Sequence, residues 1–244
     1  MFNRGRAAAA AVPASARILW HADPAVSTVY LTMDDWFNRE MVETALDIAA
    51  EESVHLTFFP VGRLVSPNVD LVRRAARDGH ELENHTWDHQ RLDLGHYPVA
   101  RIPWEIEQQF RALRSVLGPS YRQHFFRPPG GFGIFGHVNP YLVRAAANAG
   151  LQIAMWNVDS RGWRWGRRRD QAAVNGALAN VLPDLRAGAI VVQHAIPSDV
   201  LALRTEIHIA RERGLRISTL AEGILGIPPP VETDAARTVP PFRQ

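Results

Sequence analysis

Apolar and polar positions along the chain switch repeatedly between two periods. Residues 28–33 alternate apolar with polar side chains, which is typical of a β-strand. Residues 39–52 instead place apolar side chains at intervals of three and four, which predicts a helix, and Asn38 is suited to cap its first turn. Strand and helix patterns alternate in this way about seven times in all along the chain.

The remaining elements follow from the same two patterns. Further strands are predicted at 54–59, 80–84, 124–127, 151–156, 189–193 and 215–219, and further helices at 67–78, 99–117, 140–149, 170–186 and 199–213. Short apolar strands that alternate with one-sided helices indicate a parallel sheet or barrel covered by helices. A doubly wound sheet is the alternative, but no glycine-rich phosphate loop follows the first strand. We expect one α/β domain over residues 17–226, a distorted (β/α) barrel of about seven parallel strands.

Both ends of the chain lie outside this pattern. Residues 1–16 place two arginines before an alanine-rich stretch and end in Ala14-Ser15-Ala16, which resembles a weak signal peptide. A disordered leader is the alternative. Residues 227–244 form a proline-rich tail. No apolar run approaches the ~20 residues that a membrane-spanning helix needs, so we expect no transmembrane segment.

Composition narrows the chemistry. Cysteine is absent, so a metal site has to use His, Asp or Glu. The net charge is only +2, and every basic side chain is an arginine. Such a balance gives no broad positive field, and we therefore expect no nucleic-acid partner.

Polar side chains recur where successive predicted strands end. Asp34-Asp35, His85, Arg127, Asp159 and His194 all occupy such positions. In a β/α barrel these ends gather on one face, where catalytic groups are found. Core packing explains the apolar strand bodies, but it does not explain polar residues at five strand ends.

Two histidines and two aspartates suggest a metal site. His85 and His89 are four residues apart, about one helical turn, so they can project from one face toward a common point. With one carboxylate of Asp34-Asp35 they make three ligands and leave positions open for water and substrate. Zinc suits this set, and cobalt, nickel, manganese and iron are compatible with it. The second aspartate can take a proton from bound water. The plain alternatives are exposed or capping histidines and a helix-capping aspartate pair.

Other strand-end residues supply candidate helpers. Arg127 can hold the second aspartate through a bidentate pair, or be a surface arginine beside a Pro-Pro turn. Gly130 and Gly131 allow a backbone N–H to approach an oxyanion, or serve the turn alone. His194 can act as a general acid that Asp159 orients, with a raised pKa, or be a half-buried structural histidine.

Five sequence segments together resemble a known family. TMDDWF, HTWDH, RPPGG, VDSRGW and VVQH occur in this order, and they resemble the five motifs of the polysaccharide deacetylase family, the NodB-homology or carbohydrate esterase family 4 domain. The resemblance runs from about Tyr30 to Ala221 and implies a metal-dependent hydrolase. It implies Asp34 as the general base and Asp35, His85 and His89 as ligands to one divalent ion, with zinc first and cobalt, nickel or manganese as alternatives. It also implies that Arg127 positions the base, that the Gly130 region supplies an oxyanion N–H, and that His194 is the acid.

The chain departs from the family pattern in four of its motifs, at five positions. The usual Gly-Pro after the aspartate pair is Trp36-Phe37, the aromatic position of the third motif is Gly130, the second aspartate of the fourth motif is Gly162, and the leucine of the fifth motif is Val192. These changes bear on substrate choice and rate, since no ligand, base or acid is lost. We expect substrate contacts from Trp36, Gly130, Gly131, Trp163 and Val192.

Residues 156–169 interleave tryptophan with arginine. Tryptophan faces suit sugar rings, and arginine suits the carboxylates or phosphates of cell-wall polymers. The same pattern is compatible with stacking on single-stranded nucleic acid, and the plain alternative is a solvated basic loop with tryptophan packed beneath it.

The sequence therefore predicts hydrolysis of an N-acetyl group on an aminosugar polymer, peptidoglycan or chitin-like, so that the partner is an acetylated oligo- or polysaccharide. One alternative is hydrolysis of O-acetyl esters, small amides or cyclic imides on the same scaffold. A second is a non-catalytic, metal-containing glycan-binding protein, and a third is an iron oxygenase with two histidines and one carboxylate. The substrate class and the leader favour a secreted or cell-envelope location, with the cytoplasm as the alternative.

Overall fold

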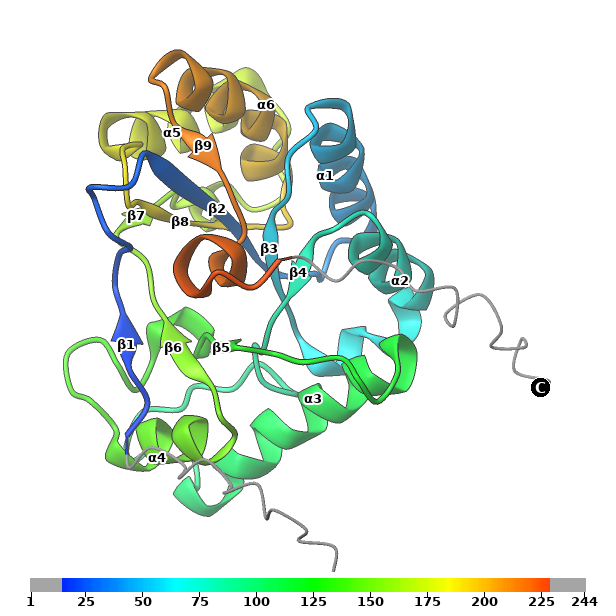
Figure 1. Cartoon of the computed structure of the whole chain (residues 1–244), viewed down its shortest axis with the longest axis vertical. Coiled ribbons are helices and arrows are strands. Elements are labelled where there is room, and N and C mark those ends of the chain that lie inside the picture. The colour runs from blue at the N-terminus through cyan, green and yellow to red at the C-terminus, as the bar shows by residue number, and fades with distance from the viewer. Residues whose placement is uncertain (1–14, 229–244) are drawn as a thin grey trace, which may run out of the picture.

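The computed structural model describes residues 15–228, and Figure 1 shows them as one α/β domain. The predicted leader up to residue 14 and the predicted tail from residue 229 lie outside the described residues. Among the described residues, no helix combines the length and the apolar character that crossing a bilayer requires.

Every strand pairing in the fold is parallel. The strands are β1 (Ile18–Leu19), β2 (Thr28–Asp35), β3 (Thr57–Pro60), β4 (Glu81–Leu82), β5 (Phe125–Phe126), β6 (Gln152–Ala154), β7 (Val158–Asp159), β8 (Ile190–His194) and β9 (Arg216–Ile217). One sheet has the order β4-β3-β2-β8-β7, with β9 also paired to β2, and the other has the order β1-β6-β5. In the part of the chain that the structure describes, one isolated bridge, between Asn84 and Phe126, connects the two sheets. The predicted distorted barrel of about seven parallel strands is confirmed in β2 to β8.

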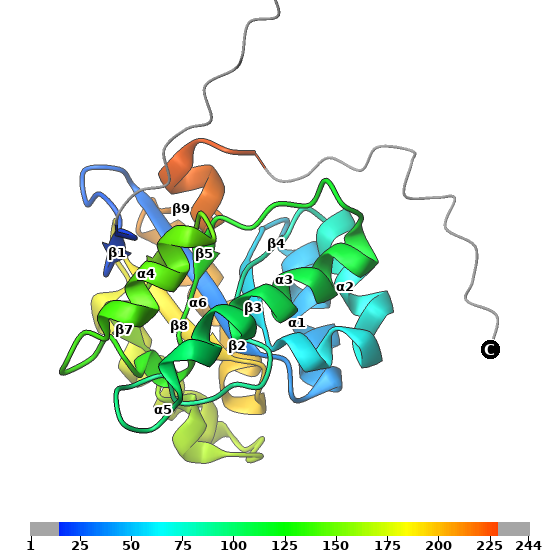
Figure 2. The same cartoon turned by 90° about the horizontal axis from the view of Figure 1, so that it is seen from below.

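Within residues 15–228, six α-helices surround the strands. They are α1 (Arg39–Glu51), α2 (Val69–Arg77), α3 (Ile102–Leu117), α4 (Pro140–Asn148), α5 (Gln171–Val181) and α6 (Pro197–Glu212). Figure 2 shows β2, β3 and β8 side by side with the helices outside them. The cap predicted for the first helix is confirmed, because the Asn38 side chain accepts a hydrogen bond from the Met41 N–H at 3.4 Å.

The central strand β2 is buried on both faces. Val29, Leu31 and Met33 pack in the core beneath the outer helices, whereas Tyr30 belongs to a second cluster in the barrel interior with residues such as Phe59. The intervening positions that look polar in the sequence are therefore buried too, because the inner face of a small barrel is filled by side chains.

The carboxyl ends of the central strands meet at one level. Asp34 of β2 is the register partner of His194 of β8 on one side and of Phe59 of β3 on the other. Two side chains predicted to be functional thus lie on adjacent strands at the same end of the barrel, as a β/α barrel requires.

A buried histidine makes the stability of this fold depend on pH. The His80 side chain is buried, and its Nδ1 accepts a hydrogen bond from the Leu56 N–H at 3.0 Å. Burial and the neighbouring His55 lower the pKa of His80 to about 4. Between pH 6.5 and about 4, His80 is therefore protonated in the unfolded chain but remains neutral in the folded chain. The folded state loses stability relative to the unfolded state as the pH falls through that window.

We expect His80→Asn to reduce this pH dependence, because the asparagine carbonyl can accept the same N–H without titrating. The wild type should lose about 3 kcal/mol of unfolding free energy between pH 7 and pH 4 through this group, and the variant should not. Urea unfolding at the two pH values measures the difference, with the exposed His137→Asn as control. Equal pH dependence in wild type and His80→Asn would contradict the assignment.

Candidate active site

The turn after β2 sets the direction of the two aspartates. Asp35 and Trp36 have φ of 81° and 75°, the left-handed region that side-chain-bearing residues seldom adopt. Each such residue costs about 1–3 kcal/mol, which surrounding packing has to offset. Here the Trp36 ring is 1% exposed and packs edge-on against Phe58, with centroids 5.5 Å apart. The prediction that Trp36 contacts substrate is therefore wrong, because its ring anchors the turn in the core.

Asp35, His85 and His89 converge as predicted for metal ligands. The Oδ1 atom of Asp35 lies 3.3 Å from Nε2 of His85 and 3.0 Å from Nε2 of His89. Ligands bound at about 2.0–2.1 Å in a tetrahedral site are about 3.3 Å apart, so this spacing fits a bound cation. Asp35 Oδ1 is also buried, and within residues 15–228 it has no hydrogen bond of acceptable geometry. The three residues fit the divalent ion that the sequence predicts.

The two histidines reach this point by a route that the sequence analysis did not anticipate. Residues 85–92 are not helical, so the interpretation that one helical turn separates His85 and His89 is wrong. Thr86 and His89 instead have φ of 66° and 61°. Two left-handed residues turn the loop back on itself and bring both imidazoles to one side.

Buried polar groups hold this loop in place. The Asn84 side chain accepts the Thr86 N–H at 3.1 Å, and the buried Glu105 carboxylate accepts the N–H groups of Trp87 and Asp88 at 3.0 and 2.9 Å. These side chains satisfy backbone donors that no helix or strand pairs. The geometry of the ligand pair is thus fixed from α3, which carries Glu105.

The His85 ring is oriented by a second contact. Its Nδ1 lies 2.8 Å from the backbone carbonyl oxygen of Arg127, to which it donates. This hydrogen bond places the proton on Nδ1 and turns the lone pair of Nε2 toward Asp35, the arrangement found in metal-ligating histidines.

Arg127 lies beside Asp34 in the barrel interior. Its Nη1 donates to Asp34 Oδ1 at 2.7 Å and to the Thr32 hydroxyl at 2.7 Å, and its Nε donates to the Ala154 carbonyl at 2.9 Å. The guanidinium also lies 4.1 Å from the centroid of the Phe59 ring. The predicted contact between Arg127 and Asp34 is confirmed, but it is not bidentate. The other N–H groups of Arg127 donate to backbone carbonyls of the barrel instead. Burial lowers the pKa of Arg127, and the charge of Asp34 opposes that shift.

His194 faces a carboxylate, but not the predicted one. Asp199 Oδ2 accepts the His194 backbone N–H at 2.8 Å and lies 3.6 Å from the ring nitrogen Nδ1, an ion-pair distance. Burial lowers the pKa of His194, but the Asp199 carboxylate and the charges of Asp35 and Asp34 outweigh burial and raise it to about 9. Asp159 accepts the Arg161 N–H at 2.8 Å instead, so its predicted role in orienting His194 is wrong.

Sequence reasoning missed Asp199 altogether. A signal was present in the phrase HAIPSD, because Pro197 is suited to the first turn of a helix. α6 does begin at Pro197, and its first turn folds Asp199 back to the end of β8.

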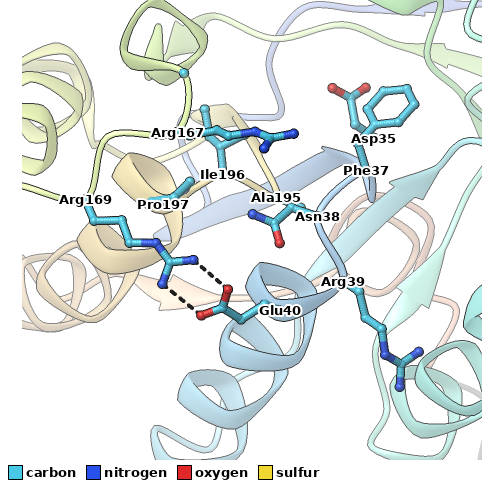
Figure 3. Close-up of a pocket in the computed structure, with 11 residues that line it drawn as sticks. Asp35, Phe37, Asn38, Arg39, Glu40, Arg167, Arg169, Ala195, Ile196 and Pro197 are labelled. Carbon is cyan, nitrogen blue, oxygen red and sulfur yellow. Dashed lines mark hydrogen bonds and ion pairs between the residues drawn. The ribbon is translucent and has the colours of Figure 1, made fainter.

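A groove of about 590 Å³ opens beside Asp35. Figure 3 shows Phe37 next to Asp35, and Arg167 across the groove near Ile196. Phe37 is 51% exposed and lines the groove, so it offers the aromatic contact that was expected of its neighbour Trp36. Arg169 closes one end through an ion pair to Glu40, with Nη1 and Oε1 2.8 Å apart.

The other predicted substrate contacts are placed as follows. Trp163 is 58% exposed, with the Arg164 guanidinium 5.3 Å from its ring, and Gly130 is exposed with φ of 58°. Substrate contact by these two stays a prediction. The Gly131 N–H donates to the Pro128 carbonyl at 2.9 Å and is thus committed to the turn. Val192 is 1% exposed within β8, so its side chain packs beneath the site and does not contact substrate.

A second group of potential ligands lies at the opposite ends of the strands. Glu81, Glu83 and His124 are close together, but their carboxylates already accept the Thr57 hydroxyl and the N–H groups of His124 and Phe125. Burial raises the pKa values of both Glu81 and Glu83, which lie beside each other. These contacts explain the cluster as a structural one.

Comparison with known proteins gives consistent matches. The polysaccharide deacetylase family model matches residues 21–154. A chitooligosaccharide deacetylase of Rhizobium leguminosarum bv. trifolii is 34% identical over 201 residues, which cover 82% of this chain and 84% of that protein.

Solved structures share the fold. The polysaccharide deacetylase Bc1974 from Bacillus cereus superposes with a TM-score of 0.70 at 25% identity, covering 79% of this chain and 91% of the other. BA3943 from Bacillus anthracis, described as a pseudoenzyme of carbohydrate esterase family 4, gives a TM-score of 0.74 at 23% identity, covering 85% and 69% of the two chains.

Proposed function

Because this chain belongs to the polysaccharide deacetylase family, we propose that it is a metal-dependent hydrolase that removes N-acetyl groups from an aminosugar oligomer or polymer. One observation carries the proposal. The ligand atoms of Asp35, His85 and His89 converge next to the carboxylate of Asp34, which Arg127 holds from the other side. We also propose that the enzyme works with its polymer in the secreted or cell-envelope fraction.

Each residue has a distinct task in this proposal. Asp35 and the two histidines hold one divalent ion, with zinc first and cobalt, nickel or manganese as alternatives. Such an ion, when bound, lowers the pKa of water and polarises a carbonyl oxygen. Asp34 takes the proton of the attacking water as general base, because Arg127 holds its carboxylate next to the ligand Asp35.

His194 supplies the other proton transfer. It lies across from Asp34 on the neighbouring strand, and its raised pKa keeps the ring protonated at neutral pH. A protonated imidazole can give its proton to the departing amine nitrogen, which an amide needs for cleavage. The base and the acid thus lie on adjacent strands at the same level of the barrel.

The non-catalytic alternative is less well supported. BA3943 shares the fold, so the fold alone does not imply activity. What favours catalysis here is that Asp34, His194 and the three ligand residues are all retained and arranged together.

Acetate release tests the proposal. Metal-free protein is incubated with an N-acetylglucosamine oligomer while zinc is added, and acetate and free amine are measured in parallel. We expect turnover to rise with zinc and to reach its plateau near one ion per chain. Peptidoglycan fragments, acetylated xylan and a small cyclic imide serve as competing substrates. Zinc-loaded protein that releases acetate only from xylan, or that acts on none of them, would contradict the proposal.

A further inference from the structure

We infer that Asp199 is the positioning residue that holds the His194 imidazole in place, and that it can do so because residue 162 is a glycine. The inference rests on the proposed function, in which His194 donates a proton to the departing nitrogen. The carboxylate that orients His194 then comes from α6, rather than from Asp159 as the sequence predicted.

Asp199 binds the end of β8 through one carboxylate oxygen. Its Oδ2 accepts the His194 backbone N–H at 2.8 Å and the Ser160 hydroxyl at 3.0 Å, and lies 3.6 Å from the His194 ring nitrogen Nδ1. The side chain is fully buried. The carboxylate thus binds the His194 backbone N–H, while the ring nitrogen Nδ1 lies at ion-pair distance from it and has no hydrogen-bond partner within residues 15–228. Attraction to the carboxylate favours a proton on Nδ1.

Gly162 leaves the space that this carboxylate fills. A Cβ atom on residue 162 would lie 1.9 Å from Asp199 Oδ1 and 2.4 Å from its Cγ. Gly162 is not among the glycines with positive φ, so its backbone accepts a side chain and only the carboxylate excludes one. Asp199 Oδ1 is also buried without a hydrogen-bond partner in residues 15–228, as expected of a group packed against a bare glycine.

Asp199 has a helix N-terminus and a second buried carboxyl group beside it. It lies in the first turn of α6, where the helix dipole stabilises an anion. The nearby Glu206 is fully buried, and burial together with the charge of Asp199 raises its pKa, so Glu206 remains neutral. Gln193 donates to Glu206 at 2.9 Å. Of the two buried carboxyl groups, Asp199 is the one that faces His194.

The test compares two leaving groups in the zinc-loaded protein. An amide needs a proton on its departing nitrogen, whereas 4-nitrophenyl acetate releases a stable phenolate without one. We expect Asp199→Asn to lower kcat on the N-acetylglucosamine oligomer by about 10²-fold, with KM and zinc content unchanged, and to change the ester rate far less. Asp184→Asn, an exposed carboxylate paired with Arg186, is the matched control and should leave both rates unchanged.

A second, independent test moves the carboxylate from residue 199 to residue 162. Gly162→Asp alone should lower amide turnover, because its side chain collides with Asp199. Combining it with Asp199→Ala should restore turnover at least about tenfold over Asp199→Ala alone, because the new carboxylate occupies the vacated space. A purely structural role of Asp199 predicts equal losses on amide and ester and no recovery in the double variant, and either result would overturn the inference.

The outcome remains distinguishable from failure of the proposed function. If the wild type releases no acetate from any aminosugar, the proposed function fails. The Asp199 inference is then judged by the nitrogen NMR signals of the His194 ring at a pH well above 9, where the ring is neutral and has one of two tautomers. Loss of the Nδ1–H form in Asp199→Ala supports the inference, and an unchanged tautomer overturns it.

Discussion

Replacing Asp34 by asparagine is expected to stop acetate release while leaving the metal site intact. Asparagine keeps the shape of the side chain but cannot accept a proton from water. General-base catalysis contributes about 10²–10⁴-fold, and we expect kcat to fall by about 10³-fold. Asp34 Oδ2 lies 3.8 Å from His85 Nε2, farther than Asp35 Oδ1 at 3.3 Å, which is why we assign the base role to Asp34 and the ligand role to Asp35.

The zinc content of Asp34→Asn separates these two roles. Zinc near one ion per chain together with lost turnover is the expected result, and steady-state kinetics with metal analysis of the same sample measures both. Asp34→Asn without bound zinc would mean that Asp34 is a ligand and that the assignment of the two aspartates is reversed. Turnover near that of the wild type would mean that another group takes the proton.

Arg127→Met should cause a large loss of both stability and turnover. Arg127 is fully buried, and the side chain of its partner Asp34 is only 4% exposed. Removing one member of a buried ion pair leaves the other charge without its counterion, which costs about 3–5 kcal/mol. The variant also loses the hydrogen bonds to Thr32 and Ala154. We expect the unfolding free energy from urea titration to fall by about that amount, and Asp34 to lose its fixed orientation.

Two controls make the Arg127 result specific. Arg186→Met breaks an exposed ion pair, with the side chains of Arg186 and Asp184 67% and 52% exposed, and should cost about 0–1 kcal/mol. The double variant Arg127→Met/Asp34→Ala removes both charges, so it should recover part of the lost stability without recovering turnover. A single variant as stable as the wild type would show that the pair does not stabilise the barrel end.

The fold was predictable because most elements carry a strong period. The predicted strand at 28–33 and helices at 99–117 and 140–149 correspond to β2, α3 and α4 with small shifts at their ends. β7 was not predicted because only two residues pair there, within a segment dominated by tryptophan and arginine. The segment 158–159 is a strand only because β8 lies beside it, which local sequence does not reveal.

The site was predictable as a set of residues but not as a geometry. His85 and His89 do converge, although through a loop with two left-handed residues rather than a helical turn. Trp36 was expected to contact substrate, but its backbone is left-handed and its ring is buried in the core. Asp199 lies beside His194 because the first turn of α6 packs against the end of β8. No repeating pattern in the sequence indicates this tertiary contact.

The central claim is that Asp35, His85 and His89 hold one catalytic cation. Calorimetric titration of metal-free protein with zinc tests it most directly, using wild type, His89→Gln and the exposed control His96→Gln. We expect one zinc ion per chain in wild type and control, and a zinc affinity weaker by at least about 10–100-fold in His89→Gln. Loss of a residue that only hydrogen-bonds to a metal ligand already weakens metal binding by about that factor. Equal affinity in His89→Gln, or no zinc binding by the wild type, would contradict the claim.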